Sequence, residues 1–232
     1  MDNQPPSQTP AQSALSIPRS LFLFAILYGG MVPLGGFLGA KQVAIYLPFG
    51  LGPLAVEAGI FPFLTLVAIS SAIAELHGKA TADRLVRYGF VPLVIAILLA
   101  LLTLQLPTDP GMYPPAKEAF PIIVGQSWRM MAAGIVAYGV SVTLNIWIFD
   151  KLRPKDGSTA SRWAGLRGFV AAALSQIVDT LIFITASFYG VRPILDLMLG
   201  QMLAKVVLSA VLVPLIIWAV VAISHRLDGK RS

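Results

Sequence analysis

The composition of the chain points to a membrane protein. It has 232 residues, of which 56% are hydrophobic and only 12% are charged, and its mean hydropathy is +0.78. Soluble domains carry about 25% charged residues, so this composition excludes an ordinary soluble domain and also a disordered chain. The absence of cysteine excludes a disulfide scaffold. Because basic residues in membrane proteins gather in cytoplasmic loops, the net charge of +6 gives no reason to expect a nucleic-acid partner.

The chain divides into a polar start, a long apolar middle and a short basic end. Residues 1–17 are rich in Pro, Gln and Ser and predict a disordered N-terminus. A helix needs about 20 apolar residues to cross the bilayer, and windows near this length predict an all-α, polytopic domain of six transmembrane helices over residues 18–225. A basic tail, 226–232, follows. The windows are 21–40, 58–74, 89–106, 130–149, 168–191 and 197–224.

Two stretches between these windows are interrupted by proline and glycine. Residues 42–56 are uncharged but contain Pro48, Gly50, Gly52 and Pro53. Such backbone is tolerated at membrane depth only against protein or water, which favours an interfacial or re-entrant segment, with a seventh span as the alternative. Residues 107–121 hold five prolines and are expected to form an external loop.

The distribution of basic residues sets the orientation. Lysine and arginine are concentrated after the second window, after the fourth window and in the tail. The positive-inside rule assigns these segments to the cytoplasm, and an even number of spans then places both termini there. We expect a multi-pass protein of the cell inner membrane, surrounded by the lipid bilayer, and the sequence leaves room for a homo-oligomer.

Two ionisable residues fall inside the predicted spans. Asp179 lies about 18 Å along a helix from Arg167, and Lys205 lies about 20 Å from Arg192 on the other side, at 1.5 Å per residue. Both are therefore expected near the middle of the membrane, on adjacent helices. Because ionisable groups are costly there, they are typical of a polar substrate cavity. A structural ion pair between the two spans is the alternative, and the two interpretations are compatible.

Other polar residues accompany Asp179. Ser175 and Gln176 precede it by four and three residues, which places them on the same helical face. A carboxylate, an amide and a hydroxyl suit a flat ligand with several hydrogen-bonding groups, although Ser175 and Gln176 could equally bond a neighbouring helix. Asn145 is the strongly polar residue of the fourth window, and Glu75 ends the second, where a solvated helix end is the simpler interpretation.

Motifs of common enzymes are missing from the sequence. It contains no G-x-S-x-G elbow, no H-E-x-x-H, no phosphate-binding G-x-x-x-x-G-K-[ST] loop and no cluster with metal-ligand spacing. We therefore expect no enzyme, no cofactor and no metal. A transporter of a small molecule, or the substrate-binding subunit of a larger transporter, is favoured.

Two runs of residues carry a family resemblance. The first is F-P…E-x-x-G-K, formed by Phe61, Pro62, Glu75, Gly78 and Lys79. The second is R…S-Q-x-x-D-T…F, formed by Arg167, Ser175, Gln176, Asp179, Thr180 and Phe183. In order and spacing the chain resembles the queuosine precursor transporter family, also described as vitamin-uptake-like. The resemblance implies six transmembrane helices and uptake of a 7-deazaguanine-type precursor (preQ0, preQ1 or queuine-like) for tRNA modification.

The resemblance also gives a set of candidate substrate-binding residues. A guanine-like edge offers N–H donors to Asp179, its carbonyl side could meet Gln176, and Phe183 could stack on the ring. The chain departs from the family at Ser71, Asn145 and Ala171–Ala172, where polar family residues are neutralised. An ATP-driven vitamin transporter that uses this chain as its binding subunit is the alternative function. The full set is Ser175, Gln176, Asp179, Phe183, Lys205, Glu75, Asn145 and Arg167.

Overall fold

The computed structural model describes residues 17–46, 53–152 and 164–229 and consists mainly of helices. Two short strands lie between the first two helices. The elements in chain order are α1 (Arg19–Gly39), β1 (Gln42–Ile45), β2 (Leu54–Glu57), α2 (Ile60–His77), α3 (Lys79–Gln105), α4 (Pro114–Lys151), α5 (Ala164–Phe188) and α6 (Leu195–Leu227).

Most of these helices are long and apolar enough to cross a membrane. Among the described residues five qualify by length and hydropathy, namely α1, α2, α3, the Pro114–Ser141 part of α4, and α6. The helix α5 has 25 residues, and its described part Leu174–Phe188 is also apolar. The structure therefore supports a polytopic helical protein.

The stretch expected to be interfacial or re-entrant is a short β-hairpin within an otherwise helical fold. β1 and β2 pair antiparallel, with Gln42 opposite Glu57 and Ile45 opposite Leu54. The ladder satisfies backbone groups that proline and glycine would leave unpaired in a helix. A seventh helical span is thereby excluded for the described parts of this stretch; the segment 47–52 that joins the strands lies outside them.

Two helices begin earlier than the sequence predicted. α3 starts at Lys79, so its first two turns carry the charged residues assigned to a loop. α4 starts at Pro114, inside the stretch expected to be a loop. Proline is tolerated in a first helical turn, where its missing N–H would have no partner in any case, and Pro121 then lies within the helix.

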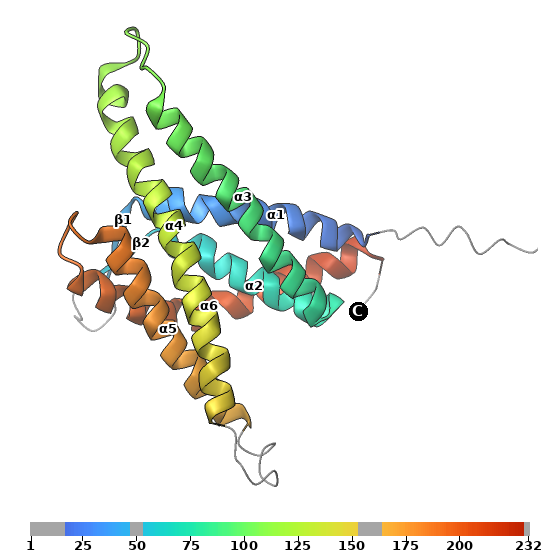
Figure 1. Cartoon of the computed structure of the whole chain (residues 1–232). Helices are drawn as coiled ribbons and strands as arrows, with labels where there is room; N and C mark the ends of the chain where they lie inside the picture. Colours follow the sequence, from blue (N-terminus) through green and yellow to red (C-terminus); the bar gives the residue numbers. More distant parts are fainter. Residues whose placement is uncertain (1–16, 47–52, 153–163, 230–232) are drawn as a thin grey trace, which may run out of the picture.

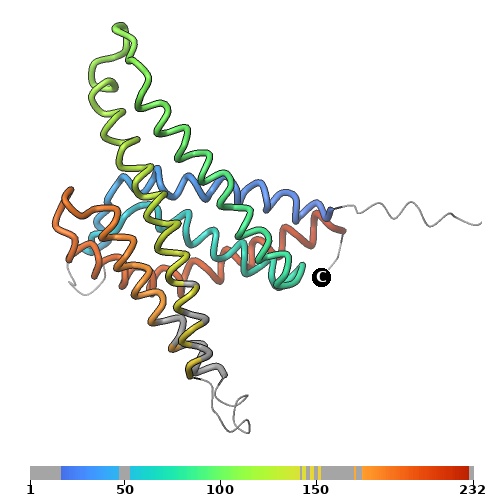
Figure 2. Tube along the Cα trace, in the orientation of Figure 1, coloured from blue at the N-terminus to red at the C-terminus, as the bar shows by residue number. Residues whose placement is uncertain are grey.

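The helices form two groups that cross each other. In Figure 1, α1, α2 and α6 run alongside one another, and the α4–α5 pair lies across them, with α3 passing over α1 to meet α4. The trace in Figure 2 brings the start of α1 next to the end of α6. There the Ser20 hydroxyl donates to Asp228 Oδ2 at 2.5 Å and lies 3.3 Å from His77 Nε2. The two ends of the described chain therefore lie on the same side of the molecule.

Glycines allow the closest approaches between elements. Gly78, with φ of +84°, is the single residue between α2 and α3. Gly200 brings the backbone of α6 against β2, and a Cβ at this position would collide with the carbonyl oxygen of Ala55. The hairpin is thus seated directly on α6, next to the apolar cluster around Val56 and Ile60.

We predict that Gly200→Ala lowers the thermal unfolding temperature of the detergent-solubilised protein. The added methyl group must displace β2 from α6, and overpacking of this kind costs about 1–3 kcal/mol. Gly125→Ala is the matched control, because a Cβ at Gly125 meets nothing within 4 Å and alanine favours a helix over glycine. Equal unfolding temperatures for the two variants would contradict the close contact.

Candidate functional site

A partly open cavity of about 320 Å³ lies where the two groups of helices cross. Residues of all six helices and of β2 line it. Its surface is mostly apolar, with a few polar side chains that include Glu57, Asp179, Gln201 and Lys205. Small-molecule sites commonly have volumes of about 300–1,000 Å³ and this kind of lining, so the cavity is the candidate site.

An ion pair between α5 and α6 forms one polar wall. Lys205 Nζ donates to Asp179 Oδ2 at 3.0 Å and to the Thr180 hydroxyl at 3.1 Å. The Ser141 hydroxyl lies 3.3 Å from the other oxygen of Asp179 and donates to it. The ammonium also lies 5.1 Å from the ring centre of Phe63, within the range of a cation–π contact. With about 15% of each side chain exposed, the pair is sheltered yet open to the cavity.

A second polar wall joins the hairpin to α6. Gln201 Nε2 donates to Glu57 Oε1 at 2.7 Å, and the Glu57 backbone N–H donates to Gln201 Oε1 at 3.3 Å. The Glu57 side chain is 4% exposed, and its Oε2 has no hydrogen-bond partner among the described residues. Gln201 and Lys205 are four residues apart on α6, so one helical face carries both polar walls.

Glu57 lies in β2, outside the helices that can span a membrane. Burial raises the pKa of its carboxyl to about 7, against the opposing effect of the hydrogen bond from Gln201. A carboxyl with this pKa takes up and releases a proton near neutral pH.

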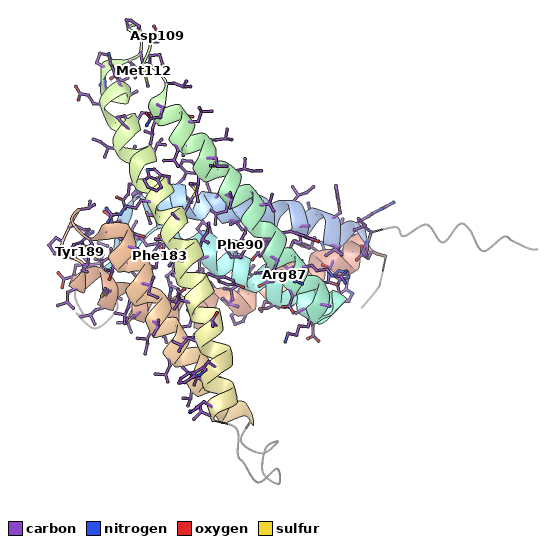
Figure 3. The ribbon with its side chains drawn as sticks, viewed as in Figure 1. Arg87, Phe90, Asp109, Met112, Phe183 and Tyr189 are labelled. Carbon is purple, nitrogen blue, oxygen red and sulfur yellow. The ribbon has the colours of Figure 1, made fainter. Side chains whose placement is uncertain are left out.

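Aromatic side chains cover much of the apolar surface of the cavity. Phe63 of α2, Phe90 of α3, Tyr138 of α4 and Phe183 of α5 all line it. The rings of Phe90 and Tyr138 lie 5.1 Å apart, centre to centre. Figure 3 labels Phe90 and Phe183, which come from helices on either side of α4 in this view. These rings can hold a flat ligand by stacking.

The structure brings together only part of the predicted site. Asp179, Lys205 and Phe183 line the cavity. Ser175 is buried and Gln176 is exposed, and neither is among the lining residues. Glu75 is exposed near the end of α2, away from the cavity. The side chains of Asn145 and Arg167 lie outside the described part of the structure.

Sequence reasoning missed Glu57 and Gln201. Glu57 carried a signal, because it is the one charged residue between positions 42 and 74. Gln201 carried another, since it precedes Lys205 by one helical turn within a strongly apolar span. Their contact joins positions 144 apart in the chain, which no local pattern reveals.

The apolar helices, the cavity and its few polar groups are those of a multi-pass membrane protein with room for a small molecule. Residues 57–219 match the family model described as "Putative vitamin uptake transporter". The match covers more than half of the chain, which therefore belongs to this family of membrane transporters. No solved structure matches the chain.

A curated relative has a more specific name. The chain is 26% identical over 164 residues to the "Probable queuosine precursor transporter" of Bacillus subtilis (strain 168). The similarity covers 69% of this chain and 70% of the relative. The predicted resemblance to queuosine precursor transporters is thereby confirmed.

We predict that Asp179 and Lys205 stabilise the fold as a pair. Asp179→Asn alone leaves the Lys205 ammonium in the interior without its carboxylate, and Lys205→Met alone leaves the carboxylate without its cation. The double variant should recover about 1–3 kcal/mol relative to the sum of the single effects, as measured by a double-mutant cycle on unfolding in detergent. Additive effects would show that the two charges do not interact.

We also predict that Glu57 makes stability depend on pH. Its pKa rises from 4.5 to about 7 on folding, so the folded protein binds an extra proton between these values. The free energy of unfolding should fall as pH rises from 4.5 to 7 and level off above. Subtracting the pH profile of Glu57→Gln isolates this contribution, and parallel profiles for the two proteins would refute it.

Proposed function

We propose that this transporter imports a 7-deazaguanine-type base across the inner membrane as a precursor for tRNA modification. The observation that carries the proposal is the Asp179–Lys205 pair, which faces a cavity of about 320 Å³ lined by aromatic side chains. The name of the Bacillus subtilis relative supports the same class of substrate.

The chemistry of the polar wall formed by Asp179 and Lys205 fits such a base. A guanine-like ring presents two adjacent N–H donors beside a carbonyl oxygen, and a carboxylate accepts such a pair of donors. We propose that Asp179 accepts from the N–H edge, and that Lys205 donates to the carbonyl oxygen while it keeps a weaker hydrogen bond to Asp179. Phe183 supplies a ring for stacking from the helix that carries Asp179. The carbonyl partner expected from the sequence, Gln176, is replaced in this proposal by Lys205.

The remaining candidates have a different standing. Ser175 is proposed to support Asp179 from within the helix packing, since it is buried one turn before it. Glu75, Asn145 and Arg167 stay predictions from the family resemblance. No direct contact with the ligand is proposed for them.

A binding subunit of an ATP-driven transporter would need a docking surface for its partner. Small residues on the first helix, such as Gly29 and Gly36 of α1, would suit such a surface. Two of them are used inside the molecule, because a Cβ on Gly36 would collide with Met131 of α4 and Gly29 faces Pro92 of α3. This packing favours a transporter that works alone, and uptake by the purified chain in liposomes is the direct test.

We predict that Asp179→Asn reduces uptake of a labelled 7-deazaguanine precursor about tenfold or more. The amide turns one acceptor oxygen into a donor group, which removes a charge-assisted hydrogen bond of about 1.5–3 kcal/mol. The measurement is initial uptake by cells that lack their own importer, at equal amounts of protein in the membrane.

Asp196→Asn is the matched control, because Asp196 is exposed in the first turn of α6 and does not line the cavity. It should transport at the wild-type rate. Wild-type uptake by Asp179→Asn would refute the assignment of the site. Failure of the unaltered protein to take up any 7-deazaguanine precursor would refute the proposed substrate.

A further inference from the structure

We infer that Glu57 is the proton-binding residue of this transporter and that uptake of the substrate is driven by protons that bind to its carboxyl. The inference rests on the proposed transport function and adds its energy source. It starts from a buried carboxyl group that the substrate proposal does not use.

The hydrogen bonds of Glu57 leave one carboxyl oxygen unsatisfied. Oε1 accepts from Gln201 Nε2, and the amide oxygen of Gln201 accepts from the Glu57 backbone. Oε2 is buried and has no partner among the described residues. A buried charged acceptor without a donor is costly because it has lost its hydrogen bonds to water. A proton on the carboxyl removes the charge and so lowers this cost.

The surroundings of Oε2 are shaped for a small carboxyl group. Gly39 and Gly59 face it with no side chain, and a Cβ on either glycine would collide with this oxygen. A Cβ on Gly59 would also collide with the backbone carbonyl oxygen of Gly35. Glu57 Oε2 and the Gly35 carbonyl oxygen both adjoin Gly59, and both are hydrogen-bond acceptors. A proton on the Glu57 carboxyl turns one acceptor into a donor and so removes the repulsion between them.

No described cation forms an ion pair with Glu57. The charge of Lys205 favours an ionised Glu57, but Lys205 is bound to Asp179 and Thr180. Asp179 of α5, Tyr28 of α1 and Tyr138 of α4 are the other titratable groups that line the cavity, and none is a cation. The lining residues of α2 and α3 are not ionisable, and the side chain of Lys41, next to the hairpin, is exposed.

The position of Glu57 can link its proton to the substrate. Gln201 and Lys205 lie one turn apart on α6, so the residue that holds Glu57 and the residue that holds Asp179 move together. In the proposed cycle a proton from outside binds the Glu57 carboxylate. The protein then changes from an outward-open to an inward-open state with the carboxyl neutral and the substrate bound, and the proton leaves to the cytoplasm. One proton and one substrate molecule then enter together, and the carboxylate is regenerated. A carboxyl with a pKa of about 7 is suited to both steps.

The test uses the purified full chain in liposomes with a labelled 7-deazaguanine precursor. With the membrane potential held at zero by valinomycin and equal potassium on both sides, a gradient of one pH unit, acid outside, should drive about tenfold accumulation if one proton accompanies each substrate. Glu57→Gln should lose this accumulation and still exchange internal for external substrate at equal pH. Glu118→Gln is the matched control, an exposed carboxyl in α4, and it should accumulate substrate like the unaltered protein.

Two further measurements keep the inference testable if Glu57→Gln fails to fold. Glu57→Asp keeps a titratable group and should retain accumulation with a shifted pH profile. In weakly buffered liposomes, addition of substrate to the unaltered protein should move protons inward. Accumulation without proton movement, or gradient-driven accumulation by Glu57→Gln, would overturn the inference and leave the substrate proposal intact. Absence of precursor exchange by the unaltered protein would instead overturn the proposed function.

Discussion

The low polarity of the membrane interior is the constraint on which this structure depends. A charged side chain placed there must find a partner, and Lys205 and Asp179 meet at 3.0 Å for this reason. Their contact ties α5, which belongs to one group of helices, to α6, which belongs to the other. The cavity lies where the two groups cross. The ion pair that lowers the cost of burying the two charges therefore also lines the cavity, where a ligand can replace one of its hydrogen bonds.

The hairpin solves a related problem with hydrogen bonds instead of charges. Its strands satisfy part of their backbone groups on each other, and the reciprocal bonds between Glu57 and Gln201 attach it to α6. Gly200 permits the approach by removing the side chain that would keep the backbones apart. The hairpin thus carries a polar residue to the cavity wall at a place where no helix could.

The sequence predicted what depends on local composition and failed where distant contacts decide. Apolar windows located the helices because burial in lipid depends on each segment alone. The proximity of Asp179 and Lys205 was predictable, because the depth of each in the membrane follows from its distance along the helix from an arginine at the membrane surface. The start of α4 at Pro114 was missed because proline is permitted in a first turn. Glu57 and Gln201 were missed because their contact depends on how the hairpin docks on α6.

The single glycine between α2 and α3 limits how the cavity can open. The two helices share Gly78 as their only connection, so they cannot move apart at that end. Any widening between them is a rotation about this point, and the displacement grows along the helices. At 1.5 Å per residue, the 18 residues of α2 form an arm of about 27 Å. A small rotation at Gly78 would therefore be amplified at the far end of α2, where Gly59 and Glu57 adjoin its first turn.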